Sequence, residues 1–109
     1  MHHIAVDEYV IDVLMPDLAG HDRAPGAFLV YLAVWAELFR SGERRAPMSL
    51  RTLAERSGLS KSAVQAAVRL LKRRGLIVTR HASPTAVPEY ELVRHWVRRR
   101  AKTRATAPW

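Results

Sequence analysis

The sequence predicts a mainly helical domain that closes with a small β-hairpin. Apolar residues recur at spacings of three and four in four successive segments before residue 75, which is the period of helices with one buried face. After residue 75, a β-branched run and an alternating run flank a stretch with two prolines, the pattern of two short strands and a turn. The chain has 109 residues, enough for one core and too few for two independent domains.

The first predicted helix spans Ala5 to Leu18. Pro16 and Gly20 mark its end, because proline removes a helical hydrogen bond and glycine favours termination. The apolar side of this helix comprises Val6, Tyr9, Val10, Val13 and Leu14. An exposed part of the first four of these residues could supply the interface of a homodimer.

A second helix follows a short loop. Asp22 is its candidate cap, and Pro25 lies in its first turn, where proline is tolerated. Gly42 ends it, and a charged linker, SGERRAP, comes next. We expect this helix to be buried on more than one side and to supply the centre of the core from a wide stripe: Phe28, Leu29, Leu32, Trp35, Ala36 and Phe39.

Two further helices are joined by a tight turn. Ser49 caps the first and Gly58 stops it, and its inner residues are Leu50, Leu53 and Ala54. Ser60 caps the second, which ends at Gly75. The apolar face of that second helix comprises Val64, Ala67, Val68 and Leu71.

The predicted hairpin has Leu76 to His81 and Glu89 to Val93 as its arms. The chain then divides into three parts: an N-terminal extension over 1–23, a domain over 24–95 and a basic C-terminal tail over 96–109. Trp96 is expected to cover the core, and Trp109 to lie at the chain end.

Charge is segregated along the chain. The formal net charge is +8. Residues 1–40 carry six acids against two bases, whereas residues 41–109 carry 16 bases against four acids. A surplus of this size favours a polyanionic partner for the C-terminal part.

The strongest motif is LRTLAERSGLSKSAVQAAVRLLKRRGLIVTR, residues 50–80. It resembles winged helix-turn-helix DNA-binding proteins of bacteria and phages over residues 47–93. The matching features are the spacing of Ala54 and Gly58, Leu59 before Ser60, Val64, the Ala67–Val68 pair, Leu71, and Gly75-Leu76-Ile77 leading into the wing. The resemblance implies a trihelical core with a wing and an added N-terminal helix. It also implies binding of double-stranded DNA through residues 60–74 in the major groove, most simply for transcriptional regulation.

The face of this helix opposite its apolar side is small and polar first and basic later. Side chains at its start are placed to approach base edges, and later cations to approach the backbone. Glutamine can pair with adenine, arginine with guanine, and an alanine methyl with thymine. The expected base-facing residues are Lys61, Ser62, Gln65, Ala66 and Arg69; the expected phosphate contacts are Ser49, Arg51, Ser60, Lys72, Arg73 and Arg74.

The wing and tail add further candidates. Arg80, His81 and Thr85 belong to the predicted wing, and Arg80 is the best placed for an adjacent minor groove. A cluster that could track phosphates without reading sequence follows: Arg94, Arg98, Arg99, Arg100, Lys102 and Arg104.

Other classes of function find little support. The chain has no cysteine, its five histidines lack a metal-ligand spacing, and no phosphate-binding glycine loop or nucleophile motif occurs. We therefore expect neither catalysis, a cofactor nor a small-molecule ligand. The longest apolar run, residues 27–36, is half a membrane span, so a cytoplasmic protein is expected. Two alternatives stay open: a replication or partition initiator of a mobile element, and a protein-docking module with an apolar patch around Leu70.

Overall fold

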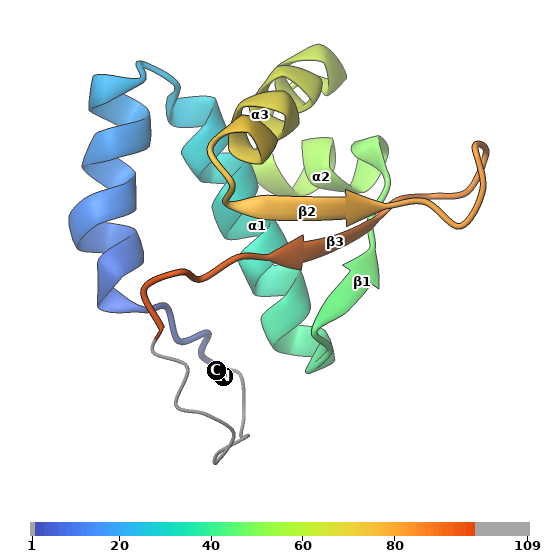
Figure 1. Cartoon of the computed structure of the whole chain (residues 1–109), viewed down its shortest axis with the longest axis horizontal. Helices are drawn as coiled ribbons and strands as arrows, with labels where there is room; N and C mark the ends of the chain where they lie inside the picture. Colours follow the sequence, from blue (N-terminus) through green and yellow to red (C-terminus); the bar gives the residue numbers. More distant parts are fainter. Residues whose placement is uncertain (1, 98–109) are drawn as a thin grey trace.

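The computed structural model describes residues 2–97 and shows helices packed around one central helix, with a small sheet on one side (Figure 1). The sheet is antiparallel, with the strand order β1-β3-β2. The mainly helical winged fold is confirmed. Its elements are η1 (Val10–Leu14), η2 (Pro16–His21), α1 (Pro25–Ser41), β1 (Arg45–Pro47), α2 (Leu50–Ser57), α3 (Lys61–Arg73), β2 (Ile77–Arg80) and β3 (Glu89–Leu92).

Helix α1 lies at the centre and contacts η2, α2, α3, β1 and β3. Because these elements surround it, its buried residues do not form the stripe that the sequence predicts. The predicted Leu29 is 42% exposed, and Leu32, Ala36 and Phe39 are only half-buried. Burial on more than one side is confirmed, and the buried residues are Ala27, Phe28, Val30, Tyr31, Val34, Trp35 and Leu38.

The N-terminal helix runs from residue 8 to residue 21, so the predicted start at Ala5 and an end at Pro16 are wrong, whereas Gly20 does lie in its last turn. The chain is wound with five-residue hydrogen bonds, such as Met15 N–H to the Val10 carbonyl, and Pro16 begins a new stretch of them. Proline is tolerated at a first helical position because its missing N–H would have no partner there. Residues four apart (Val10, Leu14 and Leu18) are therefore buried.

The predicted association stripe on this helix is also wrong in most of its members. Val10 has no exposed surface, and the Tyr9 ring stacks on Trp96 with 4.4 Å between the ring centroids. Of the four residues in the predicted stripe, only Val13, at 41% exposed, presents a large apolar side chain to solvent.

Asp22 does not cap α1, because the cap position is Ala24 and no side chain accepts a hydrogen bond there. The Asp22 carboxylate instead accepts a hydrogen bond from Arg74, just after α3, and Asp17 accepts a second one. Pro25 does occupy the first turn of α1 as predicted. The pair of acids thus ties the N-terminal helix to the end of α3.

The linker predicted over residues 41–47 contains a strand. Arg45 lies opposite Glu91, and Ala46 lies opposite Tyr90. The strand is only three residues long and ends in proline, which suits the edge of a sheet. Its partner is distant in the sequence, so the local pattern gave no sign of it.

The predicted turn between α2 and α3 is confirmed in detail. The Ser49 hydroxyl accepts from the Thr52 amide at 3.0 Å, and the Ser60 hydroxyl accepts from the Ala63 amide at 3.1 Å. Gly58, which ends α2, has a φ of 79°, a left-handed conformation that favours glycine. This conformation lets the chain turn sharply after α2, so that α3 begins only a few residues later.

The Asp7 carboxylate joins the two ends of the described chain. Its Oδ2 accepts hydrogen bonds from Arg94 Nε at 3.0 Å, Arg94 Nη2 at 2.7 Å and Trp96 Nε1 at 2.8 Å. The Arg94 guanidinium also lies 5.3 Å from the centroid of the Trp35 ring. Trp96 covers the core as predicted.

The half-buried Arg94 is therefore held by Asp7 and does not belong to a phosphate-tracking cluster, which corrects the prediction for this residue. The other predicted members, Arg98, Arg99, Arg100, Lys102 and Arg104, lie outside the described residues, as does Trp109.

We expect Asp7→Asn to lower the free energy of unfolding by about 1 to 3 kcal/mol, because it leaves the Arg94 charge uncompensated in a half-buried place. Urea denaturation monitored by circular dichroism measures this. The matched control is Glu43→Gln, which removes the same charge from an exposed side chain with no ion pair within residues 2–97. Equal losses in the two variants would show that Asp7 has no special role.

We expect the link between Asp22 and Arg74 to make stability depend on pH. Hydrogen bonding from His21, together with the Arg74 charge, holds the pKa of the Asp22 carboxyl below its ordinary value of 3.8. A carboxyl with a lowered pKa in the folded state stabilises the fold above its ordinary pKa, and this contribution is lost as the pH falls through the lowered value. Arg74→Gln should thus melt at a lower temperature than the wild type near neutral pH, and the gap should narrow below pH 3.8.

Thermal unfolding between about pH 7 and about pH 2.5 tests this expectation. Arg69→Gln is the control, because Arg69 is exposed and makes no ion pair in the described part of the chain. A gap of constant size across this range would contradict the assignment.

Candidate nucleic-acid interface

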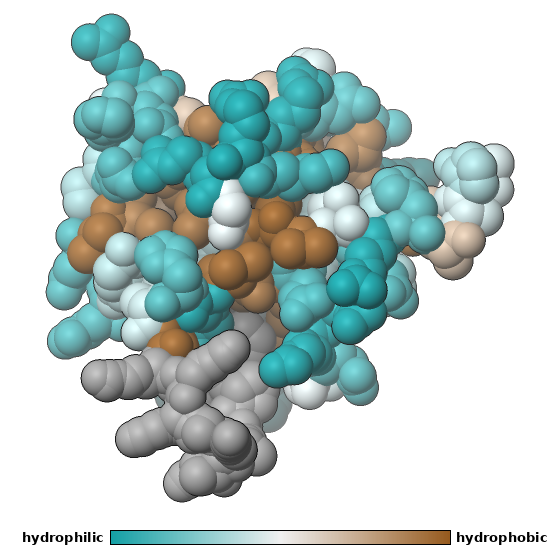
Figure 2. Space-filling model, viewed as in Figure 1, coloured by the Kyte–Doolittle hydropathy of each residue, from teal (hydrophilic) through white to brown (hydrophobic). Residues whose placement is uncertain are grey.

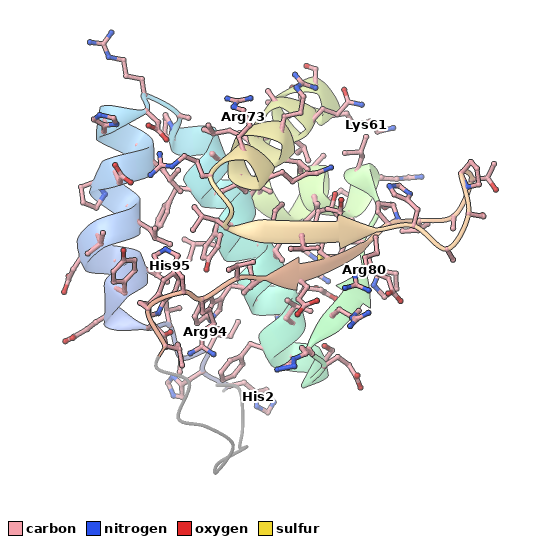
Figure 3. The ribbon with its side chains drawn as sticks, viewed as in Figure 1. His2, Lys61, Arg73, Arg80, Arg94 and His95 are labelled. Carbon is pink, nitrogen blue, oxygen red and sulfur yellow. The ribbon has the colours of Figure 1, made fainter. Side chains whose placement is uncertain are left out.

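The outer face of α3 is formed by polar and basic side chains. Val64 and Leu71 have no exposed surface and Ala67 is 5% exposed, which turns the opposite side of the helix to solvent. The predicted base-facing residues, Lys61, Ser62, Gln65, Ala66 and Arg69, are all exposed. Hydrophilic residues gather over α3 in the space-filling view, and Lys61 and Arg73 mark its two ends (Figures 2 and 3).

The cations of this face are not engaged by the protein. Within residues 2–97, the side chains of Lys61, Arg69, Lys72 and Arg73 make no hydrogen bond or ion pair, and neither does the Gln65 amide. Helix α3 also contains no acidic residue. The full hydrogen-bonding capacity of these groups is therefore available to a bound anion or base edge.

The serines predicted to meet phosphate are already occupied as caps. The Ser49 hydroxyl accepts from the Thr52 amide and donates to Thr52 Oγ1 at 3.1 Å. Ser60 is exposed and caps α3, so its end of the helix stays accessible. Arg51 is 78% exposed, with Glu55 Oε2 at 3.4 Å from its Nε. Only a weak surface pair thus holds Arg51, and its guanidinium can turn to another anion.

Arg74 differs from its neighbours Lys72 and Arg73. Both of its terminal nitrogens donate to carboxylates, of Asp17 and of Asp22. The hydrogen bond to Asp17 raises the pKa of Arg74 above its ordinary value. Of the three basic residues at the end of α3, the structure leaves two directed to solvent.

The acids around Arg74 resemble a metal site only in their spacing. Ligand atoms of Asp17, His21 and Asp22 lie within 4.8 Å of one another. The Arg74 guanidinium, however, is bound to both carboxylates and supplies the positive charge that a cation would otherwise bring. These residues fit an internal ion-pair cluster better than a metal centre.

The wing projects from the sheet as a long loop between β2 and β3 (Figure 1). Its predicted residues Arg80, His81 and Thr85 are exposed. Arg80 lies opposite Glu89 across the strand pair, which offsets part of its charge. The loop over residues 81–88 contains no Lys or Arg and carries Val87, 48% exposed, so the wing is less basic than α3.

Sequence reasoning missed a basic group beside the wing. Arg44 is exposed, and Arg45 on the edge strand β1 lies 3.8 Å from Glu91 of β3. Because β1 was expected to be a linker, its position next to the wing strand could not be foreseen.

None of the helices in residues 2–97 has the length and hydropathy of a bilayer span. Residues 40–86 match the model of the MarR family, a stretch that covers β1, α2, α3, β2 and most of the wing. Neither the curated proteins nor the solved structures gave a match. The fold and the family match together show that the chain is a winged helix-turn-helix protein, similar over residues 40–86 to the MarR family.

Proposed function

We propose that this protein binds double-stranded DNA with the outer face of α3 in the major groove and thereby regulates transcription. The observation that carries the proposal is the exposed, acid-free face of α3, whose cations and amide have no partner within residues 2–97. The match to the MarR family supports the same role. This role requires DNA binding and no catalysis. It places the protein in the cytoplasm, and on the nucleoid if the host is bacterial.

The part of α3 from Lys61 to Arg69 is assigned to base reading. The major groove is about 12 Å wide and admits a helix. Gln65 can donate to and accept from an adenine edge, and Arg69 can donate twice to guanine. Ala66 is exposed between them and offers a methyl group for thymine. Lys61 and Ser62 are at the start of the helix, where side chains come nearest to the bases.

Phosphate contacts are assigned to Lys72, Arg73 and Arg51, with Ser60 at the amide end of α3. Amide groups at a helix start attract anions. Arg74 is left out because two carboxylates already hold it. The wing residues Arg80, His81 and Thr85 are assigned to the neighbouring minor groove.

Two other roles use the same fold. A replication or partition initiator would dock on DNA through the same face, so the alternative concerns the target site and not the chemistry. A protein-docking module would need an apolar patch around Leu70. Leu70 is half-buried against the core and its exposed neighbours Arg69 and Arg73 are charged, which favours DNA over a protein partner.

We expect Arg73→Ala to weaken binding to random duplex DNA and to lower the slope of log K against log salt concentration by about one, because one phosphate contact is lost. Arg69→Ala should weaken binding as well. Fluorescence anisotropy across a salt series starting near about 50 mM measures both. Arg23→Ala is the matched control, since Arg23 is an exposed arginine remote in sequence from α3.

The wild type should bind duplex at the low end of this series. Failure of the wild type to bind, or equal affinities for wild type, Arg69→Ala and Arg73→Ala, would overturn the DNA proposal.

We expect Gln65→Ala to relax base preference at one position of the preferred site, by about 1 to 3 kcal/mol, with affinity for random duplex nearly unchanged. Selection from a randomised duplex pool, followed by binding to single-base variants, measures the preference. Lys72→Ala is the comparison, since a phosphate contact should weaken all sequences alike. A uniform loss for Gln65→Ala would place this side chain on the backbone.

A further inference from the structure

Arg74 stands beside two of the proposed phosphate contacts and is held differently from both. It directly follows Arg73, the last residue of α3, and Lys72 precedes them. Its side chain is 33% exposed, so solvent reaches the guanidinium. Both terminal nitrogens nevertheless donate to carboxylates, Nη1 to Asp22 and Nη2 to Asp17. By residue type and position, Arg74 thus belongs with the cations at the end of α3, and only its two partners set it apart.

The two carboxylates come from the end of the N-terminal helix. Asp17 lies in η2, and Asp22 is the C-cap residue of η2. Each gives its Oδ2 to Arg74 and has its Oδ1 near His21 Nδ1, at 3.8 Å for Asp17 and 3.1 Å for Asp22. Two negative charges and one positive charge leave this cluster with a net charge of −1 when His21 is neutral. A cation at the end of α3 is therefore replaced by a small negative surplus.

The contacts that hold Arg74 lie at the surface, where a DNA phosphate can compete for the same guanidinium. The side chains of Asp17 and Asp22 are 32% and 15% exposed. Ion pairs in such places are weaker than buried ones, and phosphate binds arginine by the same forked hydrogen bonds as carboxylate. An arginine side chain can turn to another anion by rotation about its own bonds, with the backbone of α3 unchanged. Contact of Arg74 with DNA thus depends on how strongly the two acids retain it.

We propose that Asp17 and Asp22 restrain the affinity of this protein for DNA by holding Arg74 away from phosphate. This restraint rests on the DNA binding proposed above and adds two residues that regulate it. It acts on affinity and not on base preference, because phosphate contacts carry no sequence information directly. Neutral amides in place of the acids would still accept hydrogen bonds from Arg74, but charge-assisted bonds are about twice as strong, so a phosphate would displace them.

The test is the double variant Asp17→Asn/Asp22→Asn, which keeps the shape of both side chains and removes their charge. Fluorescence anisotropy with random duplex should show tighter binding than the wild type at about 50 mM salt. One additional phosphate contact should steepen the slope of log K against log salt by about 0.9, so the advantage should shrink about 3.5-fold between about 50 mM and about 200 mM salt. Each single variant leaves Arg74 one carboxylate and should lie between the wild type and the double variant.

Two controls separate the release of Arg74 from a general change in charge. Glu8→Gln/Asp12→Asn also removes two acids from the N-terminal helix, but both are exposed and make no ion pair within residues 2–97. Since exposed charges are screened by salt, this control should bind duplex within about twofold of the wild type. The second control adds Arg74→Gln to the variant that lacks both Asp17 and Asp22. Most of the gain should then disappear, because no guanidinium is left to release.

An unchanged affinity and slope in the double variant, with a wild-type far-ultraviolet circular dichroism spectrum, would show that these acids only tie the N-terminal helix to α3. An equal gain in the first control, or an undiminished gain without Arg74, would reduce the effect to general repulsion of DNA. Each of these results contradicts the restraint and leaves the proposed DNA binding intact, since that is judged on the wild type and the α3 variants. A wild type that does not bind duplex would remove both.

Discussion

Burial of α1 on nearly all sides is the constraint on which the rest of the structure depends. Tyr31, Val34 and Leu38 have no exposed surface, and Trp35 has 1%. Each such apolar side chain contributes about 1.5 to 3 kcal/mol when it leaves water. The N-terminal helix, α2, α3 and the sheet are all held by this one helix. Because α3 packs against the core through its inner face, the residues on its outer face can vary to suit a binding partner without loss of core contacts.

The acids of the N-terminal part have a task that composition alone did not reveal. Asp7 holds Arg94, and Asp17 and Asp22 hold Arg74. Each pairing engages a cation that would otherwise compete for polyanions, and at the end of α3 it leaves Lys72 and Arg73, but not Arg74, directed to solvent. Within residues 2–97, the acids of the N-terminal part thus neutralise two of the arginines of the C-terminal part.

Local features of this fold could be predicted, and long-range ones could not. Ser49, Gly58 and Ser60 act on residues within four positions, and the structure has them as expected. The exposed face of α3 followed from its 3.6-residue period in the same way. By contrast, Asp7 and Arg94 are 87 residues apart, and Asp22 and Arg74 are 52 apart. Pro16 misled because it stands at the first position of a second hydrogen-bonded stretch, η2, where its missing N–H leaves no helical hydrogen bond unmade.

The small side chains on α3 bear on how selectively it can read DNA. Ala63 is half-buried and Ala66 is exposed, so neither offers a hydrogen-bonding group, and paired hydrogen bonds to bases are left to Lys61, Gln65 and Arg69. Each such contact discriminates by a few kcal/mol at most, and mismatch costs add across separate positions. A protein with so short a reading face gains selectivity by presenting it twice on one target.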